Sequence, residues 1–399
     1  MSTALKVLVC GSSIAGPAAA YWLLRNGHDV TIIERSPVLR GAGQNIDVRG
    51  SGREVLRRMN LERKVKSHST GEIGTRFVDD EDRTLWQIPA GDSDSGGTTA
   101  NVEILRGELS RLLVDALPDD TVIHLGRHIT DVDQDDGGVT VTFNDGERAR
   151  YDLIVIAEGT RSSTRRIVFG DVPTQSLGLY TAFATIPRAE DDDLYWNWYN
   201  GTGGRSITVR PDNKGTTRIA LSFLSPPMGY ENMPGDQQKT VLIEKFGDLG
   251  WKTPRILQGV AGTDELYIDY LTQVCARTYS AGRVVLLGDA AWCATPVSGL
   301  GATLALTGAY VLAGVLAGGD TVDAALCNYQ ERMSVFVDGA HKLPPGGPRL
   351  LHPRTRVGLS TLRTLMRVAG SPPARALAAL IPSRPSPTTD LPHYPDSGV

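Results

Sequence analysis

The first part of the chain alternates between apolar runs and an amphipathic segment. Residues 5–10 (LKVLVC) are almost entirely apolar, which is typical of a strand covered on both faces of a parallel sheet. Residues 14–26 have helical periodicity, and residues 29–34 (DVTIIE) form a second apolar run. This order of strand, helix and strand predicts a βαβ unit.

Later segments change period twice. Between residues 176 and 275, segments such as LYTAFATI and TRIALSF alternate in the way of strands with one buried face, so they predict an antiparallel sheet. Residues 282–340 return to long apolar runs and predict a parallel core with a long helix. The other expected elements are helices at 51–66, 102–117, 236–247 and 359–381, a loop at 91–99 and strands within 122–156, with a hairpin turn at 144–146.

The stretch from Ala290 to Gly319 contains no charged residue, so its length alone would allow a membrane span. It is rich in Gly, Ala, Thr and Ser, contains Pro296 and follows a strand. These features favour a buried helix, and we expect no membrane span.

A glycine turn follows the first predicted strand, at residues 11–16. A glycine at its start permits a tight turn, and one at its end permits close packing of helix on strand. The middle position, where backbone approaches a pyrophosphate, is serine here. The candidate dinucleotide-binding residues of this turn are Gly11, Ser13, Ile14, Ala15 and Gly16.

Glu34 ends the second predicted strand, where a carboxylate can accept hydrogen bonds from ribose hydroxyls. Glutamate at this place favours a free 2′-hydroxyl, so the site suits FAD or NAD better than NADP. Arg35 follows and is placed to lie against the adenine or its phosphate.

A second constellation distinguishes FAD from NAD. An apolar strand ends in Gly288-Asp289, and two glycines, Gly299 and Gly301, precede a helix-like run. This order places a carboxylate at a strand end and backbone N–H groups at a helix start, a combination suited to a ribityl chain and an electron-rich ring edge. Together with the first turn it predicts a flavoprotein.

The composition indicates which partners, metals and cellular compartment to expect. The 41 basic and 45 acidic residues nearly balance, so nucleic acid is not an expected partner. The four cysteines are scattered without metal or redox spacing, so we expect no metal and a reducing, cytoplasmic setting. The first residues run directly into a strand, so no signal peptide is expected.

With these motifs in place, the chain resembles the class A flavoprotein monooxygenases, which are single-component FAD-dependent aromatic hydroxylases. Within them it looks most like the short TetX-like branch. The resemblance covers about residues 5–370 and rests on four local matches, at 11–35, 43–50 (GQNIDVRG), 103–109 (EILRGEL) and 283–301 (RVVLLGDAAWCATPVSGLG).

The resemblance implies roles for further residues. Asp289 would bind the ribityl hydroxyls, and Arg106 would approach the flavin. Asp47 and Arg49 would line the flavin edge. The residues whose backbone would pack on the isoalloxazine are Pro296, Gly299, Leu300 and Gly301.

Three residues depart from the family pattern. Glu158 stands where the family has aspartate in a strand-end Asp-Gly motif, which makes contact with the reductant less secure. Trp292 replaces the usual histidine after Gly-Asp-Ala-Ala, and Gly308 replaces an aspartate of the long helix.

The resemblance implies an α/β fold, with a Rossmann-like FAD-binding domain of PHBH type around a parallel sheet, an inserted antiparallel-sheet substrate domain and a carboxy-terminal helix. The expected parts are FAD-binding segments at 1–75, 101–175 and 281–340, substrate-domain segments at 76–100 and 176–280, a helical segment at 341–381 and a disordered tail at 382–399.

The expected activity is hydroxylation of an aromatic or polyketide-like small molecule by FAD, NADPH or NADH and O₂ through a C4a-hydroperoxyflavin, in a monomer or homodimer. Baeyer–Villiger oxidation, epoxidation, flavin-dependent reduction and flavin binding without turnover remain open.

Phe183, Trp196 and Trp198 are either an aromatic wall for the substrate or ordinary sheet packing. No residue is compelling as catalytic acid or base. The acidic run 190–193 is expected to be a solvated loop.

Overall fold

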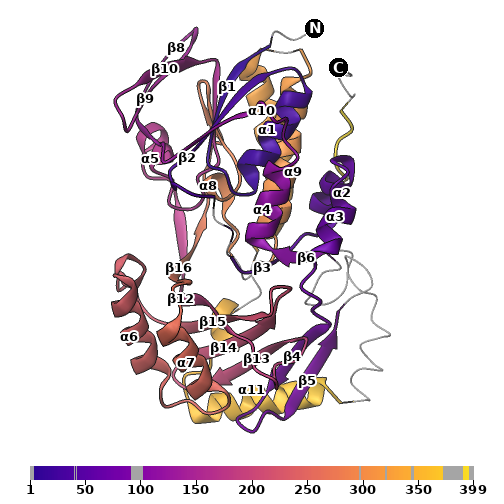
Figure 1. The fold of residues 1–399 in the computed structure, drawn as a ribbon, viewed down its shortest axis with the longest axis vertical. Coiled ribbons are helices and arrows are strands. Elements are labelled where there is room, and N and C mark those ends of the chain that lie inside the picture. Colours follow the sequence, from indigo (N-terminus) through magenta and orange to yellow (C-terminus); the bar gives the residue numbers. More distant parts are fainter. Residues whose placement is uncertain are drawn as a thin grey trace.

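The computed structural model describes residues 4–39, 41, 43–90, 102–295, 298–319, 321–342, 346–371 and 390–394. Two large layers lie one above the other, each built on a sheet, with a small two-stranded sheet between them (Figure 1). The α/β class and both predicted sheets are confirmed.

The upper layer is built on a parallel sheet that contains the predicted βαβ unit, β1 (Lys6–Cys10), α1 (Ala15–Arg25) and β2 (Asp29–Glu34). Its strand order is β17-β18-β11-β1-β2-β7, and only the edge strand β17 runs antiparallel to its neighbour. The remaining strands are β7 (Val122–Leu125), β11 (Leu153–Ile156), β17 (Ser280–Ala281) and β18 (Val284–Leu286).

Helices and a small sheet pack around this parallel sheet. The predicted hairpin is confirmed as part of the sheet β8 (Ile129–Asp135), β9 (Gly138–Phe143) and β10 (Arg148–Tyr151). The helices of this layer are α2 (Gly50–Arg58), α3 (Glu62–Ser67), α4 (Arg106–Val114), α5 (Ser163–Phe169), α8 (Asp289–Trp292), α9 (Gly301–Leu316) and α10 (Val322–Ala340).

Two predicted helices differ from their expected ranges. The helix expected at 51–66 is broken after α2, because Asn60 adopts a left-handed conformation with φ of 58°. The helix expected at 102–117 begins only at Arg106, because β6 (Glu103–Leu105) pairs with β3 (Asn45–Asp47). The predicted loop at 91–99 lies outside the described residues.

The lower layer is the predicted antiparallel sheet, with the order β16-β12-β15-β14-β13-β4-β5. Its β13–β4 pair is parallel, and β4 comes from a distant part of the chain. The strands are β4 (Gly74–Val78), β5 (Thr84–Pro89), β12 (Thr174–Pro187), β13 (Tyr195–Gly201), β14 (Arg205–Pro211), β15 (Thr216–Leu224) and β16 (Leu266–Val274).

Helices cover this sheet. The predicted α6 (Gly235–Phe246) is joined by α7 (Thr253–Gly262), which the sequence analysis missed, and both pack on one face. The carboxy-terminal helix α11 (Arg356–Ala369) begins three residues before the predicted start, and most of the remainder of the predicted range lies outside the described residues. Short 3-10 turns occur at η1 (Tyr230–Asn232) and η3 (Gly347–Leu351).

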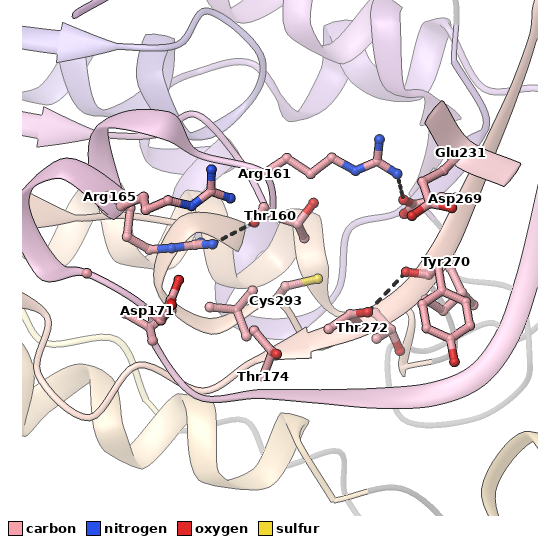
Figure 2. A pocket seen from close by; sticks show the side chains of 16 residues that line it. Thr160, Arg161, Arg165, Asp171, Thr174, Glu231, Asp269, Tyr270, Thr272 and Cys293 are labelled. Carbon is pink, nitrogen blue, oxygen red and sulfur yellow. Dashed lines mark hydrogen bonds and ion pairs between the residues drawn. The ribbon is translucent and has the colours of Figure 1, made fainter. Parts of the chain in front are cut away.

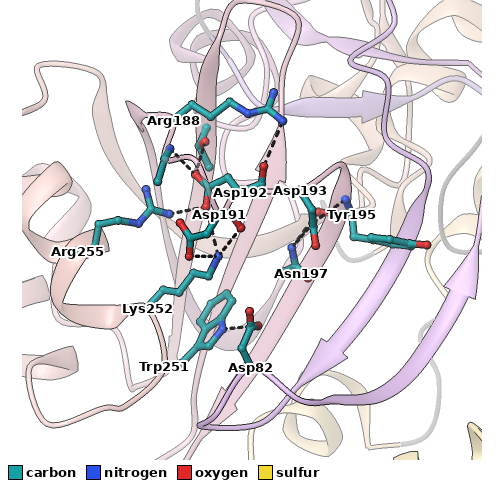
Figure 3. A network of polar contacts seen from close by, with 12 residues as sticks. Asp82, Arg188, Asp191, Asp192, Asp193, Tyr195, Asn197, Trp251, Lys252 and Arg255 are labelled. Atoms are coloured by element: carbon teal, nitrogen blue, oxygen red, sulfur yellow. Dashed lines mark hydrogen bonds and ion pairs between the residues drawn. The ribbon is translucent and has the colours of Figure 1, made fainter.

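The acidic run at 190–193 forms a loop, but the prediction that it is solvated is wrong for Asp192 (Figure 3). Asp192 is 8% exposed and pairs with Arg255 of α7 at 2.6 Å. It also accepts hydrogen bonds from the backbone N–H of Ala189 at 3.0 Å and the Thr217 hydroxyl at 2.9 Å. These contacts tie the loop to α7 and β15.

The uncharged stretch forms α8 and α9, and every residue of α9 after Gly301 is buried. No helix within the described residues is long and apolar enough to cross a membrane. The expectation of a buried helix is therefore confirmed.

Within the predicted tail, the described residues 390–394 pack against α9. A Cβ built on Gly314 would lie 2.1 Å from the Tyr394 ring, so this contact requires glycine. The carbonyl of Pro392 accepts hydrogen bonds from Arg58 at 3.2 Å and from the Tyr310 hydroxyl at 3.2 Å. These contacts join the segment to α2 and α9.

This packing gives a first prediction. Tyr394→Ala should lower the free energy of unfolding by ~1–3 kcal/mol, because the ring contact over Gly314 is lost. Tyr394→Phe is the matched control, since no described group bonds to the hydroxyl, and it should leave stability unchanged. Urea unfolding of both variants measures the difference, and an equal loss in both would contradict the assignment.

Candidate functional site

The glycine turn after β1 excludes side chains at two positions. Gly11 has φ of 110°, and a Cβ on it would lie 2.5 Å from the carbonyl oxygen of Ala157. A Cβ on Gly16 would lie 1.9 Å from the carbonyl oxygen of Gly11. The turn is therefore held tightly between β2, β11 and α1, with the amino terminus of α1, at Ile14 and Ala15, directed at its open side.

Glu34 is bound to this turn. Its carboxylate accepts the backbone N–H groups of Ser12 and Ser36, each at 2.9 Å. Carboxylate oxygens have further lone pairs, so Glu34 can still accept bonds from ribose hydroxyls. Arg35 is exposed and lines a shallow hollow with His128 and Ser163.

Arg106 reaches the same turn from the start of α4. Its guanidinium donates to the Ser13 hydroxyl at 3.3 Å, and its backbone N–H donates to the carbonyl of Gln44 at 2.9 Å. Ser110, one turn further along α4, donates to the carbonyls of Ser12 and Ser13 at 3.2 and 3.0 Å. The serine in the middle of the turn is thus used to dock α4.

The Gly-Asp motif lies directly beside the first turn. Gly288 has φ of 65°, and its Cβ would lie 3.0 Å from the Cβ of Ala15. Asp289 begins α8, and its Oδ1 would be 3.7 Å from a Cβ on Gly301. The carboxylate therefore sits at the amino terminus of α9.

Burial raises the pKa of Asp289, while the charge of Arg106 opposes the shift. The amino terminus of α9 also favours the charged form. A buried carboxylate flanked by a helix start and an arginine is suited to accept hydrogen bonds from hydroxyl groups.

Asp47 and Arg49 continue the line of the site toward α9. They form an ion pair at 2.8 Å, and a Cβ on Gly299 would lie 4.0 Å from Asp47 Oδ2. The backbone N–H of Arg49 donates to the Thr303 hydroxyl at 3.0 Å, which fixes the 45–49 segment on α9. Leu300, partly buried, precedes α9, whereas the predicted contact Pro296 lies outside the described residues.

Buried polar atoms without partners test whether FAD fits here. Among the described residues, Ser12 Oγ, Asp47 Oδ1 and Thr295 Oγ1 are buried and have no hydrogen-bond partner. They belong to the glycine turn, to the end of β3 and to the segment after α8. Because unpaired buried polar groups are costly, their alignment with both motifs fits a polar dinucleotide along this path.

Two of the family departures compensate each other. A Cβ on Gly308 would lie 2.9 Å from the Trp292 ring and 2.9 Å from Leu287. The indole therefore occupies the space that a side chain at 308 would need. Trp292 packs edge-on against Tyr279, with ring centroids 4.9 Å apart, so this region has become an aromatic core.

Glu158, the third departure, caps α5. Its carboxylate accepts the hydroxyls of Ser162 and Thr164, at 2.5 and 2.7 Å, and the backbone N–H of Thr164, at 3.1 Å. The longer side chain is thus committed to the helix start.

A pocket of about 360 Å³ lies between the 160–174 segment and β16 (Figure 2). Arg161 is paired with Asp269 at 2.8 Å across it. The guanidinium of Arg165 donates to the carbonyls of Thr160 and Ala290, at 2.7 and 2.8 Å, and Arg166 also lines the pocket. Cys293 and Thr295 border the pocket, so it adjoins the Gly-Asp motif.

The three predicted substrate residues share one face of the lower sheet. Phe183 is paired with Ala220, Ala220 with Thr208, and Thr208 with Trp198, so these side chains form one row. Phe183 stacks on Tyr267 at 5.0 Å, and Trp198 stacks on Phe77 in a cluster with Met366 of α11. Trp198 therefore also serves ordinary packing.

Comparisons with known proteins agree with this geometry. A family model described as an FAD binding domain matches residues 4–338. The flavin-dependent monooxygenase eupH of a Phoma species is 34% identical over 99% of this chain and 98% of its own, and the FAD-dependent monooxygenase asL6 of Sarocladium schorii is 31% identical over 98% of both.

The protein belongs to the class A FAD-dependent monooxygenases.

Solved structures place this monooxygenase in a fold neighbourhood. It is similar to the tetracycline destructases Tet(51), with TM-score 0.78, 29% identity and coverage of 92% of this chain and 98% of that one, and Tet(55), with TM-score 0.81, 27% identity and coverage of 99% and 100%. The fold is shared with Klebsiella pneumoniae HpxO, complexed with FAD and uric acid, at 20% identity, TM-score 0.75 and coverage of 94% and 95%.

Sequence reasoning missed several residues near the flavin path. Thr303 anchors Arg49, and Thr307 bonds Ser51 at 2.8 Å. The spacing of these threonines on one helix, beside the small residues of α9, was the available signal. The sequence analysis did not single out Arg165, because its placement beside α8 depends on tertiary structure.

The Gly-Asp assignment predicts a loss of FAD in Asp289→Ala. FAD binding should weaken roughly 10- to 150-fold, because the ribityl hydroxyls lose a charged acceptor worth roughly 1.5–3 kcal/mol. Flavin fluorescence titration of the apoprotein measures this affinity. Asp145→Ala, at a half-exposed turn carboxylate, is the control and should bind FAD normally. Full FAD occupancy in Asp289→Ala would overturn the assignment.

The contact between Gly308 and Trp292 predicts that substitutions at the two positions have non-additive effects on the free energy of unfolding. Gly308→Ala should lower the free energy of unfolding by ~1–3 kcal/mol through overpacking against Trp292 and Leu287. In a Trp292→Phe background, where the ring is smaller, the same substitution should cost less. Denaturant unfolding of the four proteins gives the coupling, and strict additivity would refute the compensation.

Proposed function

We propose that this monooxygenase uses NADPH or NADH and O₂ to hydroxylate an aromatic or polyketide-like small molecule. The observation that carries the proposal is the pairing of two surfaces. The flavin-binding segment β3–β6 lies between the two layers, and the lower sheet presents the face with Phe183, Trp196 and Trp198 on the same side as Arg210, which contacts β6. The tetracycline destructases, proteins that act on a polycyclic substrate, are consistent with this class.

Bound FAD would supply the redox chemistry, accepting electrons from the nicotinamide and activating oxygen. Asp289 would hold the ribityl hydroxyls and Glu34 the adenosine ribose. The backbone of Gly299, Leu300 and Gly301 would lie along the ring. The chain's own task is to orient the two partners and keep water away from the reacting atoms.

We assign the approach of the reductant to the arginine-lined pocket beside Thr295. Arg165, at the end of the pocket opposite the Arg161–Asp269 pair, and Arg166 supply positive charge that suits the phosphates of a nicotinamide dinucleotide, although Asp171 and Glu231 also line the pocket. Glu158 is not among the described residues that line this pocket, and its carboxylate accepts hydrogen bonds at the start of α5. No acid or base is assigned, since no titratable group on the aromatic row stands out.

Oxygen uptake and product mass test the proposal. The purified yellow protein should consume O₂ with NADPH or NADH, and a panel of phenols and tetracycline should include a compound that gains one oxygen atom. Oxygen consumption yielding only hydrogen peroxide across the panel would leave hydroxylation unsupported. Reductant oxidation with a product that gains two hydrogens would contradict it and indicate a reductase.

A further inference from the structure

The end of the β14–β15 hairpin crosses from the lower sheet to the flavin-binding layer. Arg210, near the end of β14, donates to Glu72 at 2.8 Å and to Glu103 of β6 at 2.8 Å. The side chains of the two glutamates are 0% and 2% exposed, and that of Arg210 is 13% exposed. One guanidinium therefore bridges two buried carboxylates on different segments.

The same guanidinium supports the aromatic face. Its central carbon lies 4.3 Å from the Trp196 ring, and Trp196 lies 5.2 Å from Trp198. Arg210 pairs with Arg218 in the sheet, and Arg218 pairs with Thr185, two residues beyond Phe183. Arg210 thus belongs to the face that carries the predicted substrate residues.

The turn after β14 adds further contacts to the flavin layer. Asn45 donates to the carbonyl of Pro211 at 3.0 Å and to Glu103 at 2.6 Å. Asn213 donates to Glu108 of α4 at 2.8 Å, and Lys214 pairs with the same carboxylate. Glu103 and Glu108 lie on either side of Arg106 in the sequence. The hairpin therefore contacts the chain both before and after Arg106, the residue proposed to approach the flavin.

Arg210 supplies the positive charge that pairs with both carboxylates of this cluster. The pKa of Glu103 is raised to about 7. Burial is the largest cause and the charge of Glu72 adds to it, while Arg210 and the hydrogen bonds from Thr70 and Asn45 oppose the shift. Desolvating three charged groups is costly, and a simple apolar contact would join the layers at lower cost. The arrangement provides instead a fixed geometry, because the donors of the planar guanidinium point in fixed directions and Arg210 uses two of them, Nε toward Glu72 and a terminal nitrogen toward Glu103.

We infer that Arg210 is a positioning residue that fixes the aromatic face of the lower sheet relative to the Glu103–Arg106 segment at the flavin. Its two carboxylate bonds set the β6–α4 turn, and its stacking sets Trp196. Loss of the bridge should let the two surfaces move apart, so that reduced flavin reduces O₂ to hydrogen peroxide and no oxygen atom is transferred to the substrate. This consequence for turnover rests on the proposed function, whereas the structural consequence does not.

Arg210→Lys separates positioning from charge balance. Lysine keeps the positive charge but is a point donor that cannot bridge both glutamates in the plane of a fork. Arg210→Gln removes the charge as well. Arg150→Ala is the matched control, since it removes an arginine–carboxylate pair that is 49% and 63% exposed on the small antiparallel sheet.

Hydrogen exchange of the FAD-loaded proteins is the first measurement. In Arg210→Lys, amides of residues 103–109 and 195–201 should exchange at least about tenfold faster than in the natural protein, while β1 and β2 stay unchanged. Arg150→Ala should match the natural protein. If Arg210→Gln does not fold, Arg210→Lys decides alone. If the amides of Arg210→Lys exchange at the same rates as those of the natural protein, the inference is overturned, and Arg210 only compensates the charge of the two glutamates.

Peroxide yield is the second measurement, with tetracycline as the probe. If the natural protein oxygenates tetracycline, the share of NADPH electrons recovered as hydrogen peroxide should rise severalfold in Arg210→Lys and not in Arg150→Ala. An unchanged share would overturn the positioning role. If the natural protein itself yields only peroxide with this probe, that result counts against the proposed function, and the exchange measurement still judges the inference.

Discussion

The close approach of α1 to the ends of three parallel strands is the contact on which the rest of the structure depends. Gly11 is pressed against the carbonyl of Ala157 after β11, Gly16 against the carbonyl of Gly11, and Gly288 after β18 against Ala15. The backbone contacts at Gly11 and Gly16 leave no room for a side chain, and the contact of Gly288 with the Ala15 methyl group is tight. These contacts bring together, at one edge of the sheet, Glu34 and Asp289, which we propose bind the adenosine ribose and the ribityl chain.

Hydrogen bonds and ion pairs attach further segments of the candidate site to this edge of the sheet. Serines of the glycine turn hold α4 and Arg106, and Thr303 of α9 holds the segment with Asp47 and Arg49. The β14–β15 hairpin then attaches the lower sheet to the same region through Arg210. Each of these contacts positions a segment that lies farther from the parallel sheet, so a displacement at one contact would also displace the segments attached beyond it. This order explains why polar groups are retained at the layer interface despite the cost of desolvating them.

Local patterns predicted the parts of the molecule that local forces determine. The β1–α1–β2 unit, the Gly-Asp strand end and the alternating strands were all predicted from the residues, because period and turn chemistry are encoded there. The left-handed Asn60 that divides α2 from α3 has a weak local signal, and β6 forms only because β3 lies beside it. Asp192 looked like a solvated acid, but Arg255 and Thr217, far away in sequence, bury it. The Glu72–Arg210–Glu103 bridge joins three segments and has no sequence motif at all.

A crystal structure of the FAD complex tests the account most directly. The account requires one FAD per chain, with its adenosine ribose at Glu34, its ribityl chain at Asp289 and its ring beside Gly299–Gly301, facing the sheet side that carries Phe183 and Trp196. Density in that position would confirm that the motifs from separate parts of the chain form one site. FAD bound elsewhere, or a ring held away from that sheet face, would contradict the central claim.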